Sequence, residues 1–246
     1  MKRFLIALQF LTILPIRLKS AIKEKDFGRS LLYFPLIGTL IGFLLSLTAF
    51  FLRFFPDLFM GTCILTVSVI ITGGVHLDGF ADTCDGFYGS RSREEVLKIM
   101  RDSRIGVMGV IGIVLLLLLK FTLILSIPRD SLWKSLILMA GFARWSQALS
   151  CLTSKYARQE GKAKFFIEYA SQRDVLMGGL ITFALFLLLA KLKGILMFAS
   201  AFLCTLLSIQ YVKRRIGGMT GDTIGAISEI AEVEILLLTL ISSSYS

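Results

Sequence analysis

The chain has 246 residues, of which 55% are hydrophobic and only 18% are charged. That apolar share exceeds what the core of a soluble domain can hide, so we predict a membrane protein and exclude a disordered or collagen-like chain. Four widely separated cysteines exclude a disulfide scaffold and a Cys-x-x-Cys zinc or redox pair. The net charge of +10 does not by itself imply nucleic acid, because basic residues in membrane chains mostly record topology.

Hydrophobic stretches of membrane-spanning length dominate the sequence. A helix needs about 20 apolar residues to cross roughly 30 Å of hydrocarbon. We therefore predict an all-α, polytopic transmembrane helical bundle of six to seven spans, forming a single domain over residues 1–246. The predicted spans are approximately 31–52, 58–75, 105–127, 132–152, 175–190, 194–212 and 223–241. Residues 4–16 are too few to span and include Pro15, so they predict an interfacial or re-entrant helix.

The basic residues divide unequally between the two sides of this bundle. With the N-terminus in the cytoplasm, 20 of the 27 Lys and Arg residues fall on the cytoplasmic side and five on the other. Such a positive-inside bias predicts a multi-pass protein that is embedded in the lipid bilayer of the cytoplasmic membrane. Of the two basic residues inside spans, we expect Lys120 to extend outward to the lipid interface.

A first acidic cluster directly follows the second predicted span. Asp78, Asp82 and Asp85 stand at i, i+4 and i+7, so a helix would place all three carboxylates on one stripe. Because like charges so spaced repel, we predict that a divalent cation offsets them. Oxygen ligands with a single histidine in the chain favour Mg²⁺, with Mn²⁺ possible, over zinc. The alternative is a solvated acidic face on an ordinary loop.

A second acidic cluster lies on the same predicted side, in the glycine-rich segment 217–226 and just after it. We predict that Gly221, Asp222, Glu229 and Glu232 bind substrate, because ionisable groups entering a span are costly and usually functional. The alternative is a glycine-rich turn followed by a shallow interfacial helix.

Further polar residues accompany the two clusters. Arg101 and Arg104 have the forked donors that grip a phosphate, and Asp102 between them would orient one arginine or add a metal ligand. Arg144 lies mid-span and needs a carboxylate partner or a water-filled cavity, so it is a substrate contact or half of a structural ion pair. His76, the only histidine, is a candidate general base or a structural hydrogen-bonding group.

Acids suited to Mg²⁺, nearby arginines and a glycine-rich wall together describe a site for phosphoryl or pyrophosphate chemistry. One or two metal ions would neutralise a diphosphate while an alcohol attacks phosphorus, so no covalent enzyme nucleophile is needed. No Walker-type glycine loop occurs in the sequence, which argues against an ATP-driven pump or a P-loop kinase.

Three long blocks also carry a family resemblance. Gly-Gly-Val-His-Leu-Asp-Gly-Phe-Ala-Asp-Thr-Cys-Asp-Gly at 73–86, Ile-Met-Arg-Asp-Ser-Arg-Ile-Gly at 99–106 and Gly-Gly-Met-Thr-Gly-Asp-Thr-Ile-Gly-Ala at 217–226 resemble the signatures of adenosylcobinamide-GDP ribazoletransferases, or cobalamin synthases. Ala-Leu-Gln-Phe-Leu-Thr-Ile-Leu-Pro at 7–15 and Tyr-Phe-Pro-Leu-Ile-Gly at 33–38 fit the same family. The resemblance therefore extends over nearly the whole chain.

The resemblance implies a Mg²⁺-dependent membrane enzyme at the end of cobalamin synthesis. It would join adenosylcobinamide-GDP to α-ribazole or its 5′-phosphate and release GMP, with its active site facing the cytoplasm. Asp78, Asp82 and Asp85 would be the metal ligands, and we take Asp82 and His76 as the catalytic candidates. An oligomer is possible.

Two other functions remain as alternatives. A CDP-alcohol-type phosphotransferase performs the same type of displacement, but its Asp-Gly-x-x-Ala-Arg motif and downstream paired aspartates do not follow Asp85-Gly86. A cation transporter would place its acids near the bilayer midplane in inversely repeated broken helices, and the sequence contains no evident repeat.

Overall fold

The computed structural model describes residues 1–16, 21–89 and 91–244, and these residues form an almost entirely helical protein. The first elements are α1 (Lys2–Leu11), α2 (Glu24–Ser30), the 3₁₀ turn η1 (Leu31–Tyr33), α3 (Phe34–Phe51), α4 (Asp57–Thr72) and α5 (Val75–Phe87). They are followed by α6 (Arg93–Ile99), α7 (Val107–Ser126), α8 (Arg129–Leu152), α9 (Lys164–Glu168), α10 (Gln172–Ile216) and α11 (Gly221–Ser244). The described residues contain no strand, so the predicted all-α class is confirmed.

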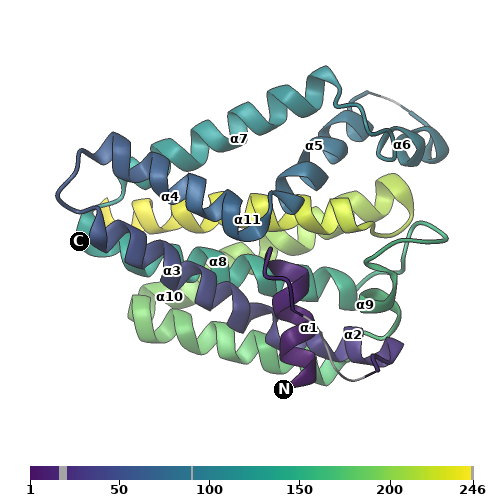
Figure 1. Ribbon diagram of the computed structural model, residues 1–246, viewed down its shortest axis with the longest axis horizontal. Helices are drawn as coiled ribbons and strands as arrows, with labels where there is room; N and C mark the ends of the chain where they lie inside the picture. The colour runs from purple at the N-terminus through teal and green to yellow at the C-terminus, as the bar shows by residue number, and fades with distance from the viewer. Residues whose placement is uncertain (17–20, 90, 245–246) are drawn as a thin grey trace.

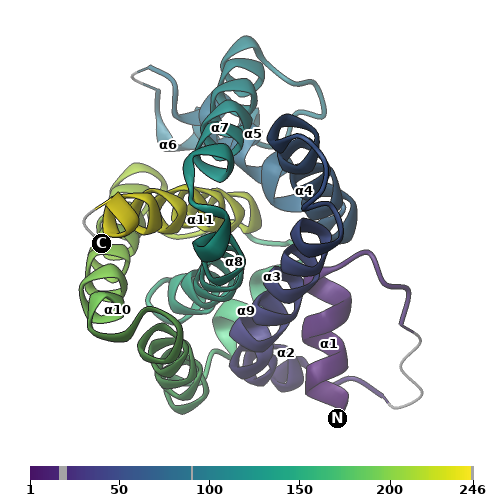
Figure 2. The ribbon, with the colours of Figure 1, turned by 90° about the vertical axis from the view of Figure 1, so that its left-hand side faces the viewer.

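Helix α8 lies at the centre of the bundle and is buried along most of its length (Figure 2). It packs against α3, α10 and α11. The contact with α3 is close because a Cβ added at Gly38 or Gly42 would lie 2.2 and 2.5 Å from the carbonyl oxygens of Ala140 and Leu136. Small residues four apart commonly allow such close approach between helices in membranes.

Fewer helices than predicted are long and apolar enough on their own to cross a membrane. Among the residues that the structure describes, three segments qualify, over residues 24–51, 107–126 and 172–216. A fourth consists of α4 and α5 together, which bend by 91° between them. The predicted count of six to seven spans is therefore not confirmed. The predicted segments 132–152 and 223–241 do form single long helices, α8 and α11, but these contain ionisable residues.

Helix α10 is a helical hairpin. The backbone of Lys191 leaves the helical region, with φ of 52° and ψ of −137°. The rings of Phe183 and Phe198 lie 5.2 Å apart, whereas 15 residues of straight helix would separate them by roughly 22 Å. The two halves therefore run antiparallel, and the break falls between the predicted segments 175–190 and 194–212.

Helix α1 ends at Leu11, several residues before the predicted end at Ile16. Thr12 has an extended backbone, and its hydroxyl donates to the Leu8 carbonyl, which ends the helix. The Ile13 amide then donates to the carbonyl of Ile71 at the end of α4. At its other end, α1 is tied to α2 by a 2.6 Å ion pair between Lys2 and Asp26.

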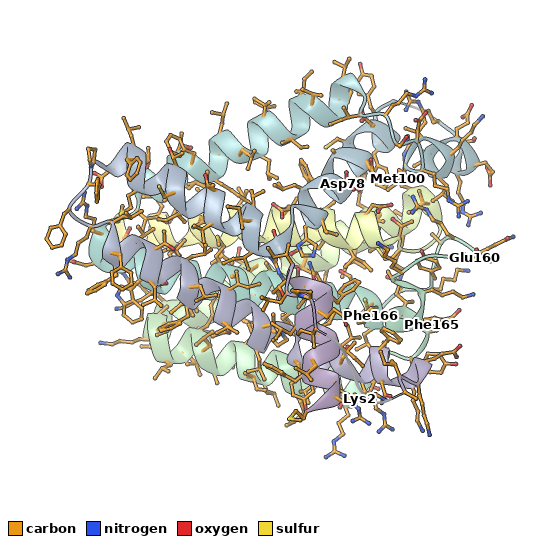
Figure 3. All side chains as sticks on the ribbon, viewed as in Figure 1. Lys2, Asp78, Met100, Glu160, Phe165 and Phe166 are labelled. Carbon is orange, nitrogen blue, oxygen red and sulfur yellow. The ribbon has the colours of Figure 1, made fainter. Side chains whose placement is uncertain are left out.

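The loops gather at two ends of the molecule (Figure 1). The α3–α4 and α7–α8 connections lie at one end, on the left of the view. Helix α6, the α8–α9 loop and the α10–α11 turn lie at the other end, on the right. Labelled residues of this second end, including Met100 and Glu160, are shown with their side chains in Figure 3.

Candidate functional site

The two acidic clusters of the sequence meet where α5 packs on α11. A Cβ at Gly79 would lie 2.7 Å from the Cα of Asp222, and one at Gly225 would lie 3.2 Å from the Cα of His76. Glycine at these two positions therefore lets the helix backbones approach closely. This contact brings Asp78 and Asp82 near Asp222, which lies 144 and 140 residues later in the chain, respectively.

The carboxylates of this contact repel one another. Helix α5 bends away from α4 by 91° and has only 13 residues, so we place the membrane-crossing part of this pair in α4 and treat the acids of α5 as lying outside the spans. Burial, followed by the negative charges of Asp222 and Asp78, raises the pKa of Asp82 to about 6. A divalent cation would relieve this repulsion, and oxygen donors from two helices suit Mg²⁺. The described residues hold no ready-made group of three acid, His or Cys ligands, so water or substrate oxygens would have to complete the shell.

Asp85 has a different environment from the other two acids of α5. Its carboxylate accepts hydrogen bonds from the backbone amides of Gly106 and Gly109, at 2.7 and 2.8 Å. These are unpaired donors at the start of α7, so Asp85 stabilises that helix terminus. Each oxygen keeps a lone pair, and the prediction of Asp85 as a metal ligand remains a prediction.

A basic side chain that sequence analysis counted only as a topology signal lies beside Asp222. Arg158 forms a 2.8 Å ion pair with Asp222 and donates to the carbonyl of Met100. Its loop is held by two hydrogen bonds to the glycine-rich turn: the Ala157 amide donates to Met219, and the Met219 amide donates to Lys155. This pairing explains why the turn before α11 is glycine-rich, because a Cβ at Gly218 would lie 2.4 Å from the Lys155 carbonyl oxygen.

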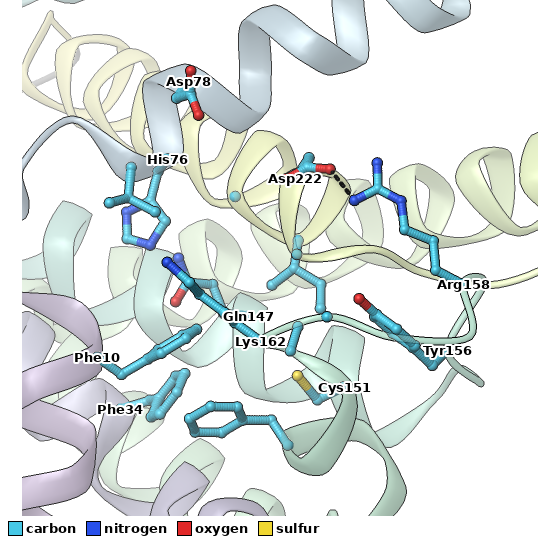
Figure 4. A pocket seen from close by; sticks show the side chains of 17 residues that line it. Phe10, Phe34, His76, Asp78, Gln147, Cys151, Tyr156, Arg158, Lys162 and Asp222 are labelled. Carbon is cyan, nitrogen blue, oxygen red and sulfur yellow. Dashed lines mark ion pairs between the residues drawn. The ribbon is translucent and has the colours of Figure 1, made fainter. Parts of the chain in front are cut away.

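A cavity of about 320 Å³ opens beside these groups (Figure 4). One part carries charge and hydroxyl groups, from Asp78, Asp222, Arg158 and Tyr156, and Lys162 lies beside Gln147 in Figure 4. The other part is largely apolar and includes three phenylalanines. A cavity with a polar end and an apolar end suits a ligand that combines a charged or hydroxylated part with a flat apolar part.

The predicted phosphate-binding arginines lie in the loop between α6 and α7. Asp102 orients Arg104 through two hydrogen bonds, at 2.8 and 3.1 Å, and this pairing lowers the pKa of Asp102 to about 2. Both side chains are exposed, and neither lines the cavity. Arg101 follows Met100, whose carbonyl accepts from Arg158, but it does not line the cavity either.

Three residues predicted to bind substrate, Arg144, Glu229 and Glu232, form a buried ion-pair network with Lys120. Lys120 of α7 contacts Glu229 and Glu232 of α11 at 2.5 Å each, and Arg144 of α8 contacts Glu232 at 2.9 Å. The prediction that Lys120 extends outward is wrong: it is 5% exposed, because its two acidic partners lie inside the bundle. Arg144 has the carboxylate partner that its mid-span position requires. Substrate contact by Arg144, Glu229 and Glu232 remains a prediction.

Comparison with known proteins identifies the family. The family model described as cobalamin-5-phosphate synthase matches residues 3–240. The chain belongs to the cobalamin-5-phosphate synthase family. It is 37% identical to the adenosylcobinamide-GDP ribazoletransferase of Acetivibrio thermocellus, covering 97% of each chain. It is 37% identical to that of Geotalea daltonii, covering 98% of each, and no solved structure matches. The protein is therefore a member of a transferase family.

Most of the residues that line the cavity of this cobalamin-5-phosphate synthase family member were not predicted from the sequence. Arg158, Lys162 and Tyr156 lie in a basic loop whose charges look like an ordinary positive-inside flank. Gln147 lies in a hydrophobic helix, where nothing in its local sequence distinguishes it. Only Arg158 could have been suspected from the sequence, because an acid such as Asp222 at the start of a hydrophobic helix needs a cationic partner.

Proposed function

We propose that this protein joins adenosylcobinamide-GDP to α-ribazole or its 5′-phosphate, releasing GMP, with Mg²⁺ as cofactor and Mn²⁺ as a possible substitute. The observation that carries the proposal is the meeting of Asp78 and Asp82 with Asp222 at the edge of a cavity, beside Arg158. Family membership supports the same reaction, because the relatives are named for it.

The proposed reaction is a displacement at phosphorus. A ribose hydroxyl of ribazole attacks the phosphorus bonded to cobinamide, a new P–O bond forms, and the P–O bond to the GMP phosphate breaks. Mg²⁺, when bound, would neutralise charge on the diphosphate. Asp78, Asp82 and Asp222 would hold it, with Asp85 as a further candidate ligand.

The chain's own side chains supply positioning and proton transfer. Arg158 lines the cavity, where its guanidinium would neutralise diphosphate oxygens, and the exposed Arg101 and Arg104 would extend the basic surface outside it. His76 lines the cavity, and its buried Nδ1 atom has no hydrogen-bond partner among the described residues. Because burial lowers the pKa of His76 to about 3, we assign Asp82 as the acceptor of the proton of the attacking hydroxyl, with His76 as the alternative acceptor.

We further propose that the bundle crosses the cytoplasmic membrane seven times, through α3, α4, α7, α8, both halves of α10, and α11. By composition alone, helices α8 and α11 are not apolar enough to be identified as membrane spans. However, their charged residues Arg144, Glu229 and Glu232 form ion pairs with one another and with Lys120 inside the bundle, away from lipid. The loops then alternate between the two ends seen in Figure 1. The end that carries the cavity would face the cytoplasm, because it carries most of the basic residues.

The decisive test is an assay of the purified protein with adenosylcobinamide-GDP, α-ribazole and Mg²⁺, measuring GMP release. We expect turnover by the wild type and a loss of at least about 100-fold in Asp82→Asn. Asp130→Asn is the matched control, because Asp130 is an exposed acid at the opposite end of α8 from the cavity. Absence of GMP release from folded wild type, with a positive control active, would reject the proposed function.

A further inference from the structure

The apolar end of the cavity is an aromatic enclosure built from three separate elements. Phe10 of α1, Phe34 of α3 and Phe166 of α9 all line it. The ring centroids of Phe10 and Phe166 lie 4.3 Å apart, and Phe34 lies within 6 Å of both. Figure 4 shows Phe10 and Phe34 at the end of the cavity away from Arg158 and Tyr156. Flat aromatic ligands are commonly held by such surfaces.

One polar side chain in this enclosure has an unused hydrogen-bond donor. Gln147 of α8 lines the cavity, and its residue is only 1% exposed. Its Nε2 atom is buried and has no hydrogen-bond partner among the described residues. A buried amide N–H without a partner is unfavourable, so a ligand that supplies an acceptor there gains affinity.

The size of the cavity limits what can enter. About 320 Å³ holds one nucleoside, whereas a corrinoid is several times larger and must lie outside. Guanine presents donors and acceptors around its whole edge, and most would be left unpaired against three phenylalanines. A benzimidazole ribonucleoside differs: one ring nitrogen carries the ribose, and the other is the base's single acceptor. That single acceptor matches the unpartnered amide donor of Gln147 beside the three phenylalanines.

We propose that the aromatic end of the cavity is the subsite for the ribazole base, with Gln147 donating a hydrogen bond to the free ring nitrogen. This inference rests on the proposed function. It adds the identity of the substrate that occupies the cavity and the orientation of that substrate within it. The ribose then points toward His76, Asp78 and Asp222, where the hydroxyl must react. Gln147 and the phenylalanines discriminate between bases and take no part in the chemistry.

The test measures both substrates separately in Gln147→Met, which keeps the shape of the side chain and removes the donor. We expect the KM for α-ribazole to rise about tenfold, as for the loss of one buried hydrogen bond. The KM for adenosylcobinamide-GDP should change by less than about twofold. Phe10→Leu, at a partly exposed position, is a second variant that tests the enclosure without depending on Gln147.

A ribazole analogue with CH in place of the free ring nitrogen makes the test specific. Wild type should bind the analogue about tenfold more weakly than α-ribazole, whereas Gln147→Met should bind the two alike. Equilibrium binding to the detergent-solubilised protein gives this result without turnover, so it separates failure of the subsite from failure of the proposed reaction. Equal affinity of wild type for both compounds would overturn the proposal. An increase confined to the KM for adenosylcobinamide-GDP would overturn it in favour of guanine.

Discussion

The buried ion pairs of Lys120 give the sharpest prediction about stability. Lys120 is the cation shared by Glu229 and Glu232, and Glu232 is shared in turn with Arg144. The four side chains balance to zero net charge, and all are at most 6% exposed. Removal of Lys120 alone leaves one uncompensated negative charge inside an apolar bundle.

The magnitude follows from that imbalance. Breaking a buried pair by removing one partner costs about 3–5 kcal/mol. At roughly 2–4 °C per kcal/mol for a chain of this size, Lys120→Met should lower the Tm by roughly 6–20 °C. The exposed pair of Arg129 and Asp57, with side chains 50% and 54% accessible, provides the matched control. Arg129→Met should cost at most about 1 kcal/mol.

The assay is thermal unfolding of the purified proteins in one detergent, followed by intrinsic fluorescence. A double variant, Lys120→Met with Glu229→Gln, restores charge balance and should recover most of the lost stability. If Lys120→Met unfolds no earlier than Arg129→Met, the network is not holding α7 to α11. If the double variant is less stable than Lys120→Met, charge imbalance is not the cause of the loss.

Three further predictions concern the contact of α5 with α11, the acids and the α10 hairpin. Gly79→Ala should lower both Tm and activity, because the added Cβ would lie 2.7 Å from the Cα of Asp222. The control Gly221→Ala should have a Tm close to that of the wild type, because its Cβ would make only an ordinary contact. Equal Tm values for the two variants would contradict this prediction. The pKa of Asp82 is raised to about 6, so ionisation of its carboxyl group costs stability as the pH rises through 6. Bound Mg²⁺ would offset that cost, so Mg²⁺ should raise the Tm more at pH 7 than at pH 5. The variant Asp82→Asn should abolish this difference between the two pH values. Lys191→Gly should stabilise the protein by roughly 1 kcal/mol in thermal unfolding, because the positive φ of Lys191 suits glycine, and an unchanged or lower Tm would refute that.

The sequence predicted the helices well where lipid or core burial alone determines them. Helices α4 and α7 match the predicted segments closely, because long apolar runs with few charges form helices whatever packs beside them. The break in α10 was also predictable, because Lys191 and Lys193 interrupt its hydrophobic run.

Sequence reasoning failed where partners come from distant segments. Lys120 pairs with acids more than 100 residues later, so its local sequence resembles that of an interfacial lysine. The aspartates of α5 were found through their spacing, but the separate role of Asp85 depends on amides at the start of α7. Arg158 was hidden because the sequence of a basic loop looks the same whether or not one of its arginines contacts an acid.

Binding of Mn²⁺, followed by electron paramagnetic resonance, most directly tests whether α5 and α11 share one metal ion. We predict that Asp82→Asn and Asp222→Asn each weaken Mn²⁺ binding by at least about tenfold, although they lie on different helices. Asp130→Asn should bind as the wild type does. Unchanged Mn²⁺ affinity in both Asp82→Asn and Asp222→Asn would contradict a metal site built where these two helices meet.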